Sequence, residues 1–171
     1  MKKQLFLLLF AGAMAFAVPH AALAQPHVYI MGGFDLSGGY DDPLNFVDRL
    51  TFSGGLDVGM GDVLAAGGQV YYQHASASTD AGDVSADLFA FMGNVSLSPA
   101  VDSSVAPFVG AGAGIARVSA DGPGGDLSDT GFAFHGFAGA RFGHFLVQGD
   151  FMHVGGDLSG NSFYAFFGVR F

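Results

Sequence analysis

Apolar residues occupy every second position over the last ten residues, 162–171. Side chains of a β-strand point to opposite faces in turn, so this alternation predicts a strand with one apolar side. The opposite face carries Gly168 and Arg170. Because a lipid-facing surface would not hold the charge of Arg170, we expect the apolar face to contact lipid and the other face to enclose an interior. The apolar residues are Phe163, Ala165, Phe167, Val169 and Phe171.

Seven earlier segments show the same alternation. Gly, Pro, Asn and Asp cluster between them, and these residue types favour turns. The pattern therefore predicts eight antiparallel strands in which short turns alternate with longer loops. We expect strands at 27–37, 49–60, 64–74, 88–97, 107–115, 132–142, 145–152 and 162–171. Short turns are expected at 61–63, 99–104 and 143–144, and loops at 38–48, 75–83, 119–130 and 155–161.

Alternating glycines mark the expected fifth strand. Gly110, Gly112 and Gly114 fall on one face, where the missing side chains leave room for bulkier neighbours inside a narrow barrel. A nucleotide-binding glycine loop is the alternative interpretation. No helical pattern follows these glycines, although that motif requires one.

Two of these segments resemble a known family. Pro107 and Phe108 with the alternating glycines, and a final strand that ends on Phe171, are similar to the small eight-stranded outer-membrane barrels. That family includes outer-membrane proteins A and X and the opacity-type surface proteins. The resemblance implies an all-β, eight-stranded antiparallel up-and-down transmembrane β-barrel in the outer membrane of a Gram-negative bacterium. It also implies a monomer amid lipid and lipopolysaccharide, and an assembly signal of Phe167, Val169 and Phe171 that the barrel assembly machinery reads.

The first residues have the pattern of an export signal. A cationic start at Lys2 and Lys3 precedes an apolar run over 5–18 and the small-residue site Ala22-Leu23-Ala24. This pattern predicts a cleavable signal peptide over 1–24, cut before Gln25. The apolar run is too short for a spanning helix. The expected mature β-barrel domain therefore covers 25–171.

Composition narrows the expected partners. Without the signal, the chain would keep four arginines against fifteen aspartates, with neither lysine nor glutamate, so its net charge would be −11. Such a chain repels phosphate backbones, so nucleic acid is not an expected partner. Cysteine is absent. Stability in an oxidising compartment is therefore expected to come from closing the sheet rather than from disulfides.

The phases of the expected strands place several charges inside the barrel. Because enclosed charges need partners, we predict a lumenal ion-pair network. An eight-stranded barrel is just wide enough for side chains to fill, so this network is expected to plug the lumen rather than to line a channel. Its predicted members are Asp35, Asp57, Asp150, Arg141 and Arg170.

Nine aspartates fall in the expected outer loops, and solvation of a polar rim explains them. Binding of divalent cations is the alternative, since aspartate oxygens suit such ions and the ions bridge lipopolysaccharide phosphates. The 121–126 segment lacks the regular ligand spacing of a calcium loop. We therefore assign no metal site, cofactor or catalytic residue. The nine aspartates are at positions 41, 42, 48, 80, 83, 121, 126, 129 and 157.

The predicted function is a non-catalytic structural or surface-interaction role, in which the barrel anchors the acidic loops. The alternatives are an outer-rim enzyme that modifies lipid A, a narrow channel, and a secreted soluble barrel with an apolar interior. His153, Asp157 and Ser159 are close in sequence and suggest a catalytic triad. The His-x-Ser-Asn pattern of the deacylase barrels is absent, however, and so is the glutamate that serves as their acid.

Overall fold

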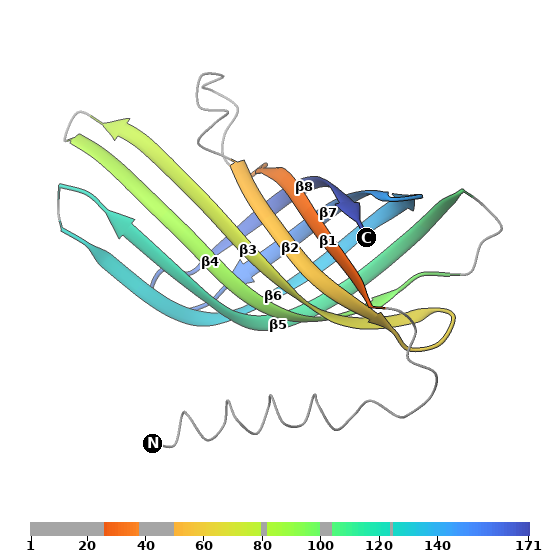
Figure 1. The fold of residues 1–171 in the computed structure, drawn as a ribbon. Helices are drawn as coiled ribbons and strands as arrows, with labels where there is room; N and C mark the ends of the chain where they lie inside the picture. Colours follow the sequence, from red (N-terminus) through yellow and green to blue (C-terminus); the bar gives the residue numbers. More distant parts are fainter. Residues whose placement is uncertain (1–25, 38–49, 80–81, 100–103, 124) are drawn as a thin grey trace, which may run out of the picture.

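The fold is a closed antiparallel β-barrel of eight strands, seen in a computed structural model (Figure 1). The structure describes residues 26–37, 50–79, 82–99, 104–123 and 125–171. Each strand pairs with its neighbours in the chain, and β1 pairs with β8 to close the sheet. Closure leaves no open sheet edge along the paired part of the wall. The strands are β1 His27–Asp35, β2 Leu50–Gly59, β3 Leu64–Thr79, β4 Gly82–Leu97, β5 Val105–Asp121, β6 Leu127–Phe142, β7 Phe145–Val154 and β8 Gly160–Arg170.

The two ends of the barrel differ in their connections. At the turn end, which we define by the turns 60–63 and 143–144, Met60 donates its backbone N–H to Leu64 over 2.7 Å. Glycines in the left-handed backbone region, Gly61 and Gly143, make these tight turns possible. The chain also finishes there, because Phe171 donates to the carbonyl of Val28. The opposite end is the loop end.

The outer surface of the barrel is apolar and its interior holds the polar groups. Phe91 on β4, Phe132 on β6 and Phe167 on β8 expose 57%, 63% and 58% of their surface, whereas their inward neighbours are buried. This arrangement confirms the strand phases predicted from the alternation. Glycines Gly110, Gly112 and Gly114 face inward, also as predicted. The exterior therefore presents the surface that the hydrocarbon of a membrane favours.

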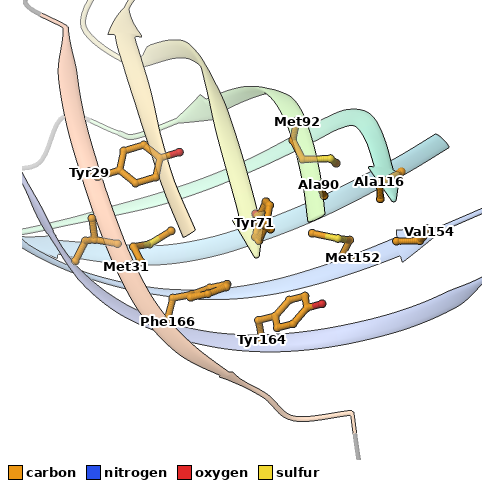
Figure 2. Close-up of a cluster of buried hydrophobic side chains, with 12 residues drawn as sticks. Tyr29, Met31, Tyr71, Ala90, Met92, Ala116, Met152, Val154, Tyr164 and Phe166 are labelled. Atoms are coloured by element: carbon orange, nitrogen blue, oxygen red, sulfur yellow. The ribbon is translucent and has the colours of Figure 1, made fainter. Parts of the chain in front are cut away.

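Large side chains from the strands fill the lumen (Figure 2). Tyr71 on β3 lies near the centre of the cluster, and its ring contacts those of Tyr164 and Phe166 on β8. Methionines adapt to the irregular spaces between these rings because their side chains are flexible. The largest fully buried side chains are Tyr71, Tyr164, Phe166, Met31, Met92, Met152, Gln69 and Thr51.

The strands have unequal lengths. β3 to β6 contain 16 or 17 residues each, whereas β1, β2, β7 and β8 contain 9 to 11. The two longer hairpins, β3–β4 and β5–β6, therefore extend past their neighbours at the loop end, at the left of Figure 1.

This extension corrects two of the predicted loops. The segments 75–83 and 119–130 were expected to be loops, but most of their residues continue β3 to β6, with pairs such as Ala75–Ala86 and Ser119–Ser128. The chain turns only near Gly82 and Gly125, which have positive φ angles. The small polar residues resemble a loop because they lie beyond the apolar belt, where the outer face of a strand no longer needs to be apolar.

Two predictions lie outside the described residues: the signal peptide over 1–24 and the loop over 38–48. The turn predicted at 99–104 also lies mostly outside them. No helix among the described residues is long and apolar enough to cross a membrane.

Candidate functional site: the filled lumen

The middle of the lumen holds a buried cluster built around Asp150 on β7. Its carboxylate accepts hydrogen bonds from Tyr71 at 2.5 Å and from the amide of Gln148 at 3.1 Å, and it pairs with Nδ1 of His135 at 3.1 Å. The side chains of His135 and Asp150 are both 0% exposed. A carboxylate buried at this depth is tolerated because several donors surround it.

The cluster continues across the barrel through amide side chains. His135 Nε2 lies 2.8 Å from the amide oxygen of Asn94, and Asn94 donates to Gln69 at 2.9 Å. Gln69 in turn donates to Ser53 and accepts from Tyr29. The polar network thereby joins β1, β2, β3, β4, β6 and β7 across the lumen. We call the residues Ser53, Gln69, Tyr71, Asn94, His135, Gln148 and Asp150 the lumenal plug.

Gly112 on β5 makes room for this plug. A Cβ atom at Gly112 would collide with Asn94 and His135 side-chain atoms and would lie 2.6 Å from the carbonyl of Gly93. The alternating glycines therefore provide the space that the sequence pattern indicated, and the group occupying that space is the Asn94–His135 hydrogen bond.

The structure divides the five predicted lumenal charges among three places. All five face inward, but Asp150 belongs to the plug, and Asp35 at the loop end accepts from Gln73 at 2.9 Å. Only the remaining three, Asp57, Arg141 and Arg170, lie together, around a cavity near the turn end.

The predicted ion-pair network therefore needs correction. Among the described residues, no aspartate lies within 4.0 Å of an arginine side chain; the ion pairs within that distance both involve histidine. Besides His135, the neutral side chains of Tyr71 and Gln148 bind Asp150, and Arg141 lies over the ring of Phe108 with its guanidinium carbon 4.7 Å from the ring centre. Amide, hydroxyl and aromatic groups thus replace the expected ionic partners.

His153, suggested for catalysis, and a second exposed histidine, His74, have other partners. His153 lies on the outer face of β7, stacks on Phe134 and bonds to the amide oxygen of Asn161 at 2.8 Å. His74 pairs with Asp87, which also accepts from Tyr72. These contacts are with an amide oxygen and a carboxylate, whereas a nucleophile–base pair requires a serine hydroxyl.

The acidic rim is described in part. Within the described residues, no group of three or more His, Asp or Glu side chains is placed to hold a metal ion. Asp41, Asp42, Asp48 and Asp80 lie outside those residues, so cation binding at the loops stays a prediction. Asp129 has a different role, because its carboxylate accepts backbone N–H groups from Thr130, Asp157 and Leu158.

The three residues of the predicted assembly signal share the lipid-facing side of β8. Phe167 and Phe171 are exposed, Val169 is partly exposed, and Phe167 stacks on Phe145 of β7. This placement agrees with the strand phase, whereas recognition by the assembly machinery stays a prediction.

The sequence predicted a filled lumen, but not the contacts that build the plug. Asp150 was placed inward, whereas its contact with Tyr71, which precedes it by 79 residues, was not foreseen. Inward-facing polar residues at the middle of several strands are the available signal. Their pairing depends on the register of non-adjacent strands, which alternation does not specify.

Comparisons with known proteins agree with this architecture. The family model described as the outer membrane protein beta-barrel domain matches residues 6–171. Among solved structures, Neisserial surface protein A is similar with a TM-score of 0.67 and 14% identity, covering 87% of this chain and 97% of that chain.

Two further solved structures share the fold. The N-terminal β-barrel domain of Pseudomonas aeruginosa OprF has a TM-score of 0.56 and 10% identity, covering 87% of this chain and 99% of that one. The attachment invasion locus protein Ail of Yersinia pestis, solved with the heparin analogue sucrose octasulfate, has a TM-score of 0.52 and 14% identity, covering 86% and 99%. None of the curated proteins matches this sequence.

Proposed function

Because this chain belongs to the outer membrane protein beta-barrel family, we propose that it is a non-catalytic membrane anchor that presents acidic loops at the cell surface. The family and the closed eight-stranded fold make it an outer-membrane protein. The proposal adds the role: the barrel supplies stability and position, and the loop end meets the surroundings of the cell.

The filled lumen is the observation that supports this role most strongly. Tyr71, Gln69 and Thr51 are buried to 1% exposure or less, and hydrogen bonds hold the plug across the barrel. A conducting pore needs a continuous water-filled path, whereas barrels of this size are filled by side chains. We therefore favour an anchor over the narrow channel.

The acidic charge of the loop end supports a surface-interaction role. Asp121, Asp126 and Asp157 are exposed there, on the extended β5–β6 hairpin and on the connection between β7 and β8. Ail was solved with a sulfated, strongly anionic ligand. An acidic rim repels such a ligand, so we propose cationic or cation-bridged partners for this chain instead.

Export and assembly complete the proposal. The signal over 1–24 would direct the chain across the inner membrane and be removed before Gln25. The terminal pattern of Phe167, Val169 and Phe171 would then engage the assembly machinery. The folded barrel would act as a monomer in lipid and lipopolysaccharide.

Outer-membrane fractionation combined with two measurements on the purified barrel tests the anchor role. We expect a gel shift on boiling, since a closed barrel stays folded in detergent until heated, and no single-channel conductance in planar bilayers. Reproducible conductance steps that disappear in a variant with bulkier plug side chains would instead establish the channel.

Lipid A composition tests the enzymatic alternative separately. Mass spectrometry of lipid A from cells with and without the protein is expected to show the same species in both. A species that depends on the protein and disappears with His153→Ala would contradict the non-catalytic role.

A further inference from the structure

A small cavity lies between the plug and the turn end of the barrel. Its volume is about 20 Å³, which is enough for one small molecule or ion, since a single water needs roughly 10–15 Å³ on this measure. Tyr29 and Gln148 border it on the plug side, and Phe108 forms part of its wall. Asp57, Arg141 and Arg170 bring charged groups to it from β2, β6 and β8.

The charges around this cavity do not balance. Two arginines, which stay charged in proteins, face one aspartate, and neither lies within 4.0 Å of it among the described ion pairs. Asp57, Arg141 and Arg170 nevertheless interact electrostatically, and the two arginines repel each other. His27, opposite Asp57 in the β1–β2 register, also interacts with that carboxylate and cannot supply negative charge. Since Tyr29 is neutral, the residues that line the cavity carry an excess positive charge; the next carboxylate, Asp150, interacts with Tyr29 but lies in the plug rather than in the lining.

One donor beside the cavity lacks a partner in the protein. The Nε–H group of Arg170 is buried and makes no hydrogen bond. A buried donor without a partner is unfavourable. Arg141 is held in place by the ring of Phe108, 4.7 Å from its guanidinium carbon, so its guanidinium is positioned beside the cavity without the flexibility of a free side chain.

We propose that this cavity binds a small inorganic anion of about the size of chloride between Arg141 and Arg170. The anion would offset the excess positive charge and accept hydrogen bonds from the N–H groups of the two guanidinium groups that border the cavity. Arginine suits this task because its planar guanidinium presents several donors to one anion. Asp57 competes with the anion for the same guanidinium groups, so its carboxylate weakens binding.

Nuclear magnetic resonance of the folded barrel in detergent tests the site. The arginine Nε–Hε signals are followed in two titrations, one with sodium phosphate and one with sodium chloride. A salt of a bulky sulfonate keeps the ionic strength constant in both. We expect the Arg170 signal to move and saturate in the chloride series, and saturation in the phosphate series alone would contradict an anion of that size. Arg117, on the outer face of β5, serves as the internal reference for unspecific effects.

Three variants sharpen the test, each first checked for folding by its gel shift on boiling. Arg141→Gln is expected to weaken binding at least threefold, Asp57→Asn to strengthen it at least threefold, and Arg117→Gln to leave it unchanged. If Arg141→Gln does not fold, Asp57→Asn decides alone. The proposal would be overturned if the Arg170 signal shifted linearly with anion concentration and in parallel with that of Arg117. It would also be overturned if Asp57→Asn did not raise the affinity for the anion.

Discussion

Asp150 and Asp87 each pair with a histidine, but in opposite surroundings. Asp150 and His135 are 0% exposed, whereas the side chains of His74 and Asp87 are 50% and 41% exposed. An exposed pair competes with water and contributes little, while a buried group that loses its partner remains desolvated. Asp150 should therefore contribute much more to the free energy of unfolding than Asp87 does.

Asp150→Ala is expected to lower the free energy of unfolding by about 3 kcal/mol, because it leaves His135, Tyr71 and Gln148 without their buried acceptor. Asp87→Ala, the matched control, should change stability little. Urea unfolding in lipid vesicles, followed by the gel shift, measures both. Equal losses for the two variants would contradict a buried plug.

Gly112 and Gly136 give a second matched pair. A Cβ at Gly112 meets Asn94 and His135, whereas nothing lies within 4 Å of a Cβ at Gly136. Gly112→Ala is expected to cost about 1–3 kcal/mol through overpacking, and Gly136→Ala to cost nothing. The same unfolding measurement compares them, and a stable Gly112→Ala barrel would show that the plug adapts easily.

Asp129 predicts a pH effect at the loop end. In the chain it precedes the lipid-facing Phe132 by three residues, so it lies nearer the loop end and outside the lipid-facing belt. The backbone N–H groups of Leu158 and Asp157 lower the pKa of its carboxyl. A lowered pKa means that the stabilisation is present above the ordinary value of about 3.9 and is lost as pH falls through the lowered value. The amide signals of Asp157 and Leu158 should accordingly shift below about pH 4, and Asp129→Asn should remove that step. An unchanged pH profile in Asp129→Asn would refute the assignment.

Alternation predicted which face each residue occupies, but not which residues meet. Asp150 was correctly placed inward, yet charge alone suggested arginine partners for it. Of the observed partners, Tyr71 comes from β3, on another side of the barrel, whereas His135 lies on the neighbouring strand β6 and Gln148 on β7 itself. Partner choice depends on register and on the space left by Gly112, which neither periodicity nor composition contains.

At the scale of elements, β4 contains both a lipid-facing and a water-facing part of the same surface. Phe91 and Ser85 point to the same side of this strand, six residues apart, but Phe91 pairs with Val70 and Ile115 in the apolar belt, whereas Ser85 pairs with Ser76 and Asp121. The limit of the membrane therefore falls between them.

Arginine at these two positions should have different costs. Phe91→Arg is expected to lower stability by about 2–4 kcal/mol, because the charge must enter hydrocarbon. Ser85→Arg should have little effect, since the side chain remains in water. Unfolding in vesicles of defined thickness measures the difference, and similar costs would mean that the membrane limit is elsewhere.

The same limit explains which elements the sequence predicted well. Strands were located correctly wherever lipid required an apolar face, as in β7 and β8. They were cut short in β3 to β6, where both faces of the extension carry small or polar residues such as Ala75 and Ser76. Cross-strand pairing continues there without an alternating pattern to reveal it.

At the scale of the whole molecule, the barrel is inverted relative to a soluble protein. Its largest exposed side chains are aromatic or aliphatic, and its interior holds a carboxylate, a histidine and several amides. Hydrocarbon is the solvent for such an exterior, and the hydrogen-bonded plug makes the interior stable without disulfides. The eight strands and this inversion were predictable because they follow from the period-two pattern and the turn residues, whereas the outer-membrane barrel class also rested on the resemblance of the fifth and last strands to a known family.

Site-directed spin labelling of β8 tests the inversion most directly, because the chain has no cysteine and single cysteines can be introduced at each position. In vesicles, accessibility to oxygen, which concentrates in lipid, should alternate along residues 163–169. High values are expected at 163, 165, 167 and 169, and low values at 164, 166 and 168. A reversed phase, or accessibility that does not alternate, would contradict a lipid-facing exterior.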